Sequence, residues 1–103
     1  PRVRESVAWL PEQQIRMQGQ LGARSSGNLK RRLLQIDEQG ILDGYFHRPG
    51  KQNWIGEHVG KYLETACNTW RLTQDTALKA QMDRVVLSLI GTQQPDGYLG
   101  TYS

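Results

Sequence analysis

The residues best suited to chemistry near the carboxyl end form the string Gln93-Gln-Pro-Asp-Gly-Tyr-Leu-Gly-Thr-Tyr102. Its Pro-Asp-Gly triplet at 95–97 suits a reverse turn, in which Asp96 simply bonds its own backbone. Alternatively, the turn presents Asp96, Tyr98 and Tyr102 to a pocket, because aromatic rings stack on the apolar faces of sugars. The residue types alone favour the turn, and the two tyrosines keep the binding interpretation open.

A second group of candidates comprises Trp54, Glu57 and His58. His58 has an ordinary pKa near neutrality, so it suits a base or a ligand, although a lone histidine beside an apolar face is more often packed. Glu57 suits a general acid or an acceptor for a sugar hydroxyl. It equally suits a helix N-terminus, where it pairs with Lys61. Trp54 is either a hydrophobic staple or a stacking platform, and the sequence does not separate the two.

The remaining reactive side chains predict no catalytic or metal centre. Cys67, the one cysteine, follows Ala66 and is expected to be a small buried residue, and a single cysteine excludes a cysteine-cluster zinc site. No Cys/His or Ser/His/Asp arrangement can be assembled from the spacing. The densest basic patch, Arg24 with 30–32, is typical of a solvated helix face, so no nucleic-acid partner is predicted.

Two amphipathic helices, predicted over 56–72 and 75–93, must position the candidates. The first stripe comprises Val59, Tyr62, Leu63, Ala66 and Trp70, and the second comprises Leu78, Met82, Val85, Val86 and Leu89. Asp75 offers an N-cap for the second helix, and Pro95 cannot continue it. Gly56 and Gly60 would let another backbone approach closely. Helices joined by so short a link form an antiparallel αα-hairpin.

The preceding residues carry weaker signals. Pro11 predicts a helix start, and the breaker cluster 22–27 predicts a loop. Asn28 as N-cap and Gly40 as C-terminal glycine predict a helix over 29–39. Residues 40–55, rich in aromatic residues and without helical period, predict an ordered loop of the kind that builds a ligand pocket. With no convincing strand pattern, the expected class is all-α.

The hairpin predicts where the candidates meet. The loop at 44–54 precedes its first helix, and the turn at 95–102 follows its second. Both therefore lie at the same end of the hairpin, and neighbouring loops at one end of a helical bundle commonly form a pocket.

Composition narrows the class further. The chain has 103 residues, one domain's worth, with 37% hydrophobic residues and a net charge of +3. No apolar run approaches the roughly 18–20 residues that span a bilayer, so no membrane partner is predicted. The chain begins with Pro1 and stops directly after the aromatic string, which leads us to expect a piece of a longer protein.

Two segments together resemble the β-L-arabinofuranosidase-type glycoside hydrolases of family 127. They are Arg48-Pro-Gly-Lys-Gln-Asn-Trp-Ile-Gly-Glu-His-Val-Gly-Lys-Tyr-Leu63 and Asp83-Arg-Val-Val-Leu-Ser-Leu-Ile-Gly-Thr-Gln-Gln-Pro-Asp-Gly-Tyr-Leu-Gly-Thr-Tyr102. The string Asn28-Leu-Lys-Arg-Arg-Leu-Leu34 is similar but less specific. The resemblance covers about the last 60 residues well.

The resemblance implies that residues 1–103 are the N-terminal fragment of an (α/α)6 barrel catalytic domain, with β-sandwich domains following in the parent. It implies a carbohydrate substrate carrying terminal L-arabinofuranosyl or related linkages, and the remainder of the parent chain as partner. In that family a cysteine nucleophile lies in a zinc-bound Cys/Glu cluster further along, so zinc is implied for the parent and no cofactor for this fragment. Cys67 does not match that cluster. The substrate contacts it implies here are His58, Asp96 and Tyr98, with Trp54 and Glu57 beside them.

Two other functions compete with this expectation. One is a free-standing helical module whose aromatic loop binds a glycan or a protein. The other is a fragment of a terpene-cyclase-like toroid, because the Gln-x-x-Asp-Gly pattern at 93–97 also resembles the repeats of those proteins. For the leading interpretation, the isolated piece is expected to hydrolyse no arabinofuranoside.

Overall fold

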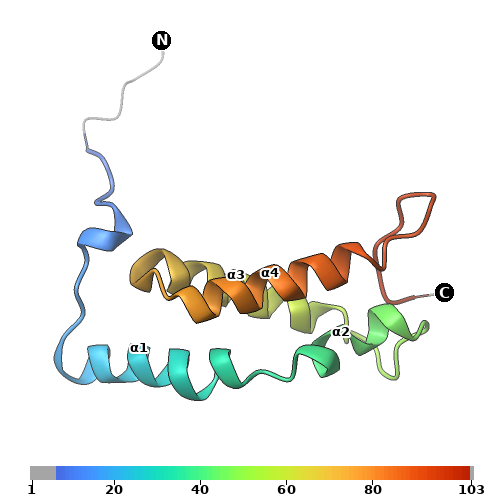
Figure 1. Cartoon of the computed structure of the whole chain (residues 1–103), viewed down its shortest axis with the longest axis horizontal. Coiled ribbons are helices and arrows are strands. Elements are labelled where there is room, and N and C mark those ends of the chain that lie inside the picture. Colours follow the sequence, from blue (N-terminus) through green and yellow to red (C-terminus); the bar gives the residue numbers. More distant parts are fainter. Residues whose placement is uncertain (1–6, 103) are drawn as a thin grey trace, which may run out of the picture.

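The computed structural model describes residues 7–102, and these residues form helices without strands (Figure 1). In chain order they are η1 (Glu12–Gln14), α1 (Gly19–Arg31), η2 (Leu33–Gln35), α2 (Glu38–Phe46), α3 (Glu57–Thr73) and α4 (Thr76–Ile90), where η marks a 3-10 helix. The expected all-α class is confirmed.

Helices α3 and α4 form the predicted hairpin and lie side by side (Figure 1). Only two residues join them: Gln74, which ends α3 in a left-handed conformation with φ of 53°, and Asp75. The Asp75 carboxylate accepts a hydrogen bond from the Leu78 N–H at 2.9 Å, which satisfies a donor that the first turn of α4 leaves free. The sharp link and the cap together fix the antiparallel arrangement.

The core lies where this hairpin packs on η2 and α2. Its apolar residues come from every helix except η1: Leu29, Leu33, Ile41, Leu42, Val59, Tyr62, Ala66, Leu78, Met82 and Val85. Both predicted stripes therefore face inward, although Val86 lies at the exposed edge. Gln81 is also buried, and its side-chain amide donates to the Leu33 carbonyl at 3.0 Å, joining α4 to η2.

The amino-terminal half departs from the expectations. The predicted loop 22–27 lies inside α1, and Asn28 is not an N-cap, because it lies near the end of that helix, whose N-cap is Gln18. Interior glycine costs about 1 kcal/mol relative to alanine, a small penalty that burial of Leu29 offsets. The helix predicted to start at Pro11 is only the short η1.

The predicted helix over 29–39 and the predicted loop over 40–55 are both wrong in their bounds. Asp37 caps a separate helix, α2, by accepting the Gly40 N–H at 3.0 Å. Gly40 thus lies in a first turn rather than after a last one. Burial of Ile41 and Leu42 holds this segment helical, and the loop shrinks to residues 47–56.

The chain is flat and open. Its extents are 47 × 46 × 23 Å, and its radius of gyration of 17.3 Å exceeds the roughly 13 Å of a compact chain of about 100 residues. Several large apolar side chains remain exposed, including Phe46 from α2 and Leu87 and Ile90 from α4. Among residues 7–102, no helix is both long enough and apolar enough to cross a membrane.

Candidate functional site

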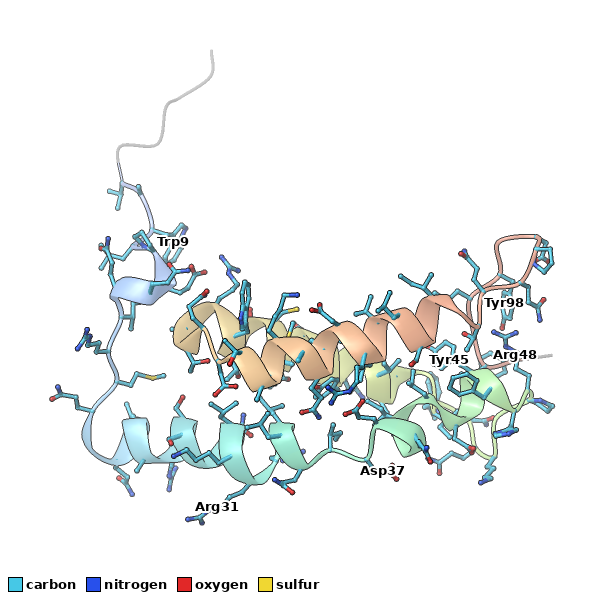
Figure 2. All side chains as sticks on the ribbon, viewed as in Figure 1. Trp9, Arg31, Asp37, Tyr45, Arg48 and Tyr98 are labelled. Carbon is cyan, nitrogen blue, oxygen red and sulfur yellow. The ribbon has the colours of Figure 1, made fainter. Side chains whose placement is uncertain are left out.

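Two segments that flank the hairpin meet at one end of it, as the sequence predicts. They are the loop 47–56 before α3 and the segment 91–102 after α4. The Gly50 N–H donates to the Thr101 carbonyl at 2.9 Å. Figure 2 places Tyr45, Arg48 and Tyr98 together at this end and Trp9 at the opposite end. We call this end the rim.

Arg48 is the main polar tie across the rim. Its Nε donates to the Gly100 carbonyl and its Nη2 to the Thr92 carbonyl, each at 2.7 Å. Its guanidinium also lies over the Tyr98 ring, 5.5 Å from the centroid. One half-buried cation therefore anchors both ends of the segment 92–100 onto the loop, through charge-assisted hydrogen bonds and a cation–π contact.

Close packing of Thr101 also holds the carboxyl-terminal segment against the loop and α2. Thr101 is 5% exposed and packs against two glycines, Gly44 and Gly56. A Cβ at Gly56 would lie 3.1 Å from Thr101 Cγ2, and a Cβ at Gly44 would lie equally close to the same methyl group. A close approach at Gly56 was predicted for another backbone, but the atoms that approach it belong to the Thr101 and Tyr45 side chains. Gly60 has open space around it instead.

A depression of about 280 Å³ opens on the rim. Its walls combine aromatic rings, one carboxylate and backbone from both flanking segments: Tyr45, Trp54, Gly56, Glu57, Gly100, Thr101 and Tyr102. Aromatic faces bind the C–H surface of a ring ligand, and a carboxylate accepts hydrogen bonds from its hydroxyl groups. The lining residues are thus of the types that can contact a small polyhydroxylated ring.

Trp54 is held in a costly backbone conformation. Its φ is 69°, in the left-handed region that bulky residues rarely adopt. Its carbonyl accepts the Glu57 N–H at 2.9 Å, closing the turn into α3, while its side chain remains 69% exposed. A staple would be covered, so the geometry favours the stacking platform. Strain of this kind concentrates at functional sites.

Glu57 begins α3 and forms the predicted pair with Lys61, whose Nζ lies 2.6 Å from Oε2. The carboxylate therefore compensates the helix N-terminus and also lines the depression. Both sequence interpretations of Glu57 are compatible with its position.

Asp96 and Tyr98 lie on the loop that follows α4. The Asp96 carboxylate accepts the Tyr98 N–H at 2.9 Å, and the Gln94 carbonyl accepts the Gly97 N–H at the same distance. Asp96 thus bonds its own backbone, as the turn interpretation expects. The Tyr98 hydroxyl accepts the Tyr102 N–H at 3.1 Å, so Tyr98 braces a wall of the depression without lining it.

His58 lies apart from the other candidates. It lines a separate hollow with Arg32 of the α1 end and Lys61 of α3, and this hollow shares no lining residue with the rim depression. Adjacent helix residues diverge by about 100° around the axis, so Glu57 and His58 face different surfaces. The structure brings Trp54 and Glu57 together but leaves His58 outside their group.

Hydrogen bonds lower the pKa of one carboxylate near the rim, that of Asp43. Nδ1 of His47 lies 2.9 Å from Asp43 Oδ1, and Nζ of Lys51 lies 3.1 Å from Oδ2. These contacts hold the pKa of Asp43 below its ordinary value of 3.8, mainly through the His47 hydrogen bond. Burial raises the pKa of Tyr45, whose hydroxyl donates to the Gly56 carbonyl at 3.0 Å. Tyr45 is therefore a neutral donor that fixes the depression's wall.

The residues described do not fit the zinc cluster that the resemblance implies for the parent. Within residues 7–102, no group of three His, Cys, Asp or Glu side chains could hold a metal ion. Cys67 is exposed, whereas the sequence predicts a small buried residue. That expectation is corrected, and Cys67 alone offers no ligand set.

Residues 8–103 match the family model for the beta-L-arabinofuranosidase GH127 catalytic domain. The chain belongs to this glycoside hydrolase family. The GH127 fold is an (α/α)6 barrel, and the helical structure of residues 7–102 agrees with it. No curated protein and no solved structure matches the chain significantly.

Sequence reasoning missed two residues of this GH127 rim. Tyr45 was expected only as part of a loop, yet it belongs to α2 and lines the depression. Arg48 contacts Gly100 across 52 positions of sequence, and no local pattern signals such a contact. The concentration of aromatic residues between 45 and 54 was the one available signal for this region.

Proposed function

We propose that this chain is the N-terminal part of a GH127 barrel and forms wall of the pocket that receives a terminal L-arabinofuranosyl group. The catalytic cluster is then supplied by the remainder of the parent chain. The family assignment favours this function over a terpene-cyclase-like toroid. It also gives a carbohydrate substrate, since glycoside hydrolases act on glycosidic linkages.

The observation that carries the proposal is the rim depression. Its volume of about 280 Å³ suits one sugar ring rather than an extended glycan. In the proposed arrangement Trp54 stacks on the ring, and Glu57 accepts a hydrogen bond from a hydroxyl group. Tyr98 and Asp96 hold the opposite wall in place through the turn at 94–98. The proposed roles thus divide four of the five predicted residues into two contacts and two positioning residues, with His58 outside the depression.

The uncovered helix faces support the structural half of the proposal. Helices α2 and α4 border an apolar groove containing Leu42, Phe46 and Leu87. Leu87 is 70% exposed, as expected if further barrel helices pack there. An (α/α)6 barrel has twelve helices, so most of the packing surface comes from other parts of the polypeptide.

Calorimetric titration of the chain with methyl β-L-arabinofuranoside tests the proposal. We expect weak saturable binding that Trp54→Ala reduces about three- to tenfold, as loss of one stacking contact implies. Trp9→Ala is the matched control, because Trp9 is 98% exposed at the far end, and it should leave the binding unchanged.

A hydrolysis assay tests the division of labour. The chain supplied with zinc should release no nitrophenol from a nitrophenyl β-L-arabinofuranoside. Turnover by the purified chain would show that it holds a catalytic centre and would contradict the proposal. Equal loss of sugar binding in Trp54→Ala and Trp9→Ala would contradict the placement of the pocket wall.

A further inference from the structure

A second hollow, of about 560 Å³, lies between the α1–α2 segment and the first turns of α3. Its floor is apolar and includes Leu33, Ile36 and Ile41. This volume falls within the range of sites that bind small molecules. An apolar floor beneath a polar edge is also the usual design of such sites, in which the floor supplies affinity and the edge fixes orientation.

The edge of the hollow is cationic. Arg32, His58 and Lys61 line it, and no carboxylate does. Arg32 makes no ion pair with any residue between 7 and 102, so its guanidinium is available to a ligand. Lys61 is paired with Glu57, which faces the rim depression instead. His58 and Lys61 lie in the first turns of the 17-residue helix α3, where the helix dipole adds positive potential.

We propose that this hollow binds a small organic anion, with a carboxylate or phosphate head group against Arg32 and Lys61 and an apolar ring on the floor. A carboxylate or a phosphate accepts paired hydrogen bonds from a guanidinium, and both head groups share this chemistry. His58 adds a hydrogen bond from its imidazole. The site is distinct from the proposed sugar contact, because the two hollows have no lining residue in common.

Titration of the full chain with matched probes, followed by NMR, tests the site. Benzoate and phenyl phosphate carry the two head groups on one ring, benzyl alcohol is the neutral counterpart, and inorganic phosphate lacks the ring. We expect both ring anions to bind at least about tenfold more tightly than benzyl alcohol, since a charge-assisted hydrogen bond has that effect. The tighter of the two identifies the head group, and inorganic phosphate alone should bind weakly.

Arg32→Gln and Arg31→Gln form the matched pair. Arg31 does not line the hollow, and Figure 2 shows it pointing away from the helices. Arg32→Gln should weaken both ring anions about tenfold, and Arg31→Gln should leave them within about twofold. Equal far-ultraviolet circular dichroism of the two variants confirms that both are folded.

Three results would overturn the proposal. Benzyl alcohol binding as tightly as benzoate would show an apolar hollow without anion recognition. Equal effects of the two arginine variants would show only general attraction to a basic surface. Absence of any shift at Ile36, Ile41 and His58 at millimolar probe would show that the hollow is not a site. None of these results bears on sugar binding at the rim, which the calorimetric titration tests separately.

Discussion

The guanidinium of Arg48 lies over the ring of Tyr98, with 5.5 Å between its central carbon and the ring centroid. These residues are far apart in sequence, since Arg48 precedes α3 and Tyr98 follows α4, and they meet at one end of the α3–α4 hairpin. Their contact, with the two hydrogen bonds from Arg48 to the Thr92 and Gly100 carbonyls, joins the loop 47–56 to the carboxyl-terminal segment. The rim depression exists because these two segments are held together.

Loss of the Arg48 contacts should release the rim. Arg48→Gln removes two charge-assisted hydrogen bonds and a cation–π contact. We therefore expect the free energy of local opening to fall by about 2 kcal/mol. Hydrogen exchange of the Gly50 amide, which donates to Thr101, measures this opening directly. Arg24→Gln, on exposed α1, is the control. Unchanged Gly50 exchange in Arg48→Gln would show that the arginine does not secure the segment.

Two glycine-to-alanine changes should have opposite effects on the free energy of unfolding. A Cβ at Gly44 would lie 2.5 Å from Ile55 Cγ2 in a packed corner, so Gly44→Ala should lower the free energy of unfolding by about 1–2 kcal/mol. Gly60 has nothing within 4 Å, so Gly60→Ala should raise it by about 0.5–1 kcal/mol through helix propensity. Urea denaturation measures both, and a stabilising Gly44→Ala would argue against the close packing of Ile55 and Thr101 around Gly44.

Trp54 should show a conflict between stability and binding. At φ of 69°, glycine is relieved of the strain that any side chain suffers, so Trp54→Gly should be about 1 kcal/mol more stable than Trp54→Ala. Both variants should bind the sugar about three- to tenfold more weakly, because both lack the ring. Chemical denaturation and calorimetry on the same pair test this. A glycine variant no more stable than the alanine variant would mean that the loop relaxes around position 54.

Acidification should weaken the contacts of Asp43 with His47 and Lys51. Its pKa is lower in the folded chain than the ordinary 3.8, first through the hydrogen bond from His47 and then through Lys51. The stability from these contacts is therefore complete above pH 3.8 and is lost as the pH falls through the folded-state pKa. An NMR titration of the Asp43 carboxyl carbon gives that value. A midpoint at or above 3.8 would contradict the structure, and Asp43→Asn should abolish the effect.

The sequence predicts this fold well where the local signals agree, and poorly where two signals compete for the same segment. The hairpin α3–α4 was predictable because two long stripes and the Asp75 cap agree. The segment 22–55 was not, because Asn28 and Asp37 are equally good caps and only burial of Ile41 and Leu42 selects Asp37. The glycines at 22 and 27 look like breakers locally and are tolerated through packing.

The candidate site was predictable in its location and less so in its members. Trp54 and Glu57 are close in sequence to the hairpin end, so topology alone brings them to the rim. The separation of His58 from Glu57 depends on which surface each helical position faces, and this requires the packing partners of α3. Arg48 acts on residues 44 and 52 positions away, beyond the range of any local pattern.

The central claim is that the rim, and not another surface, contacts the sugar. The indole N–H resonances of Trp9, Trp54 and Trp70 report on it most directly in a titration with methyl β-L-arabinofuranoside. Trp54 borders the depression, whereas Trp9 is the more exposed indole and lies at the opposite end. The Trp54 indole should shift saturably while the Trp9 indole stays in place. A stationary Trp54, or equal movement of Trp9, would contradict the account.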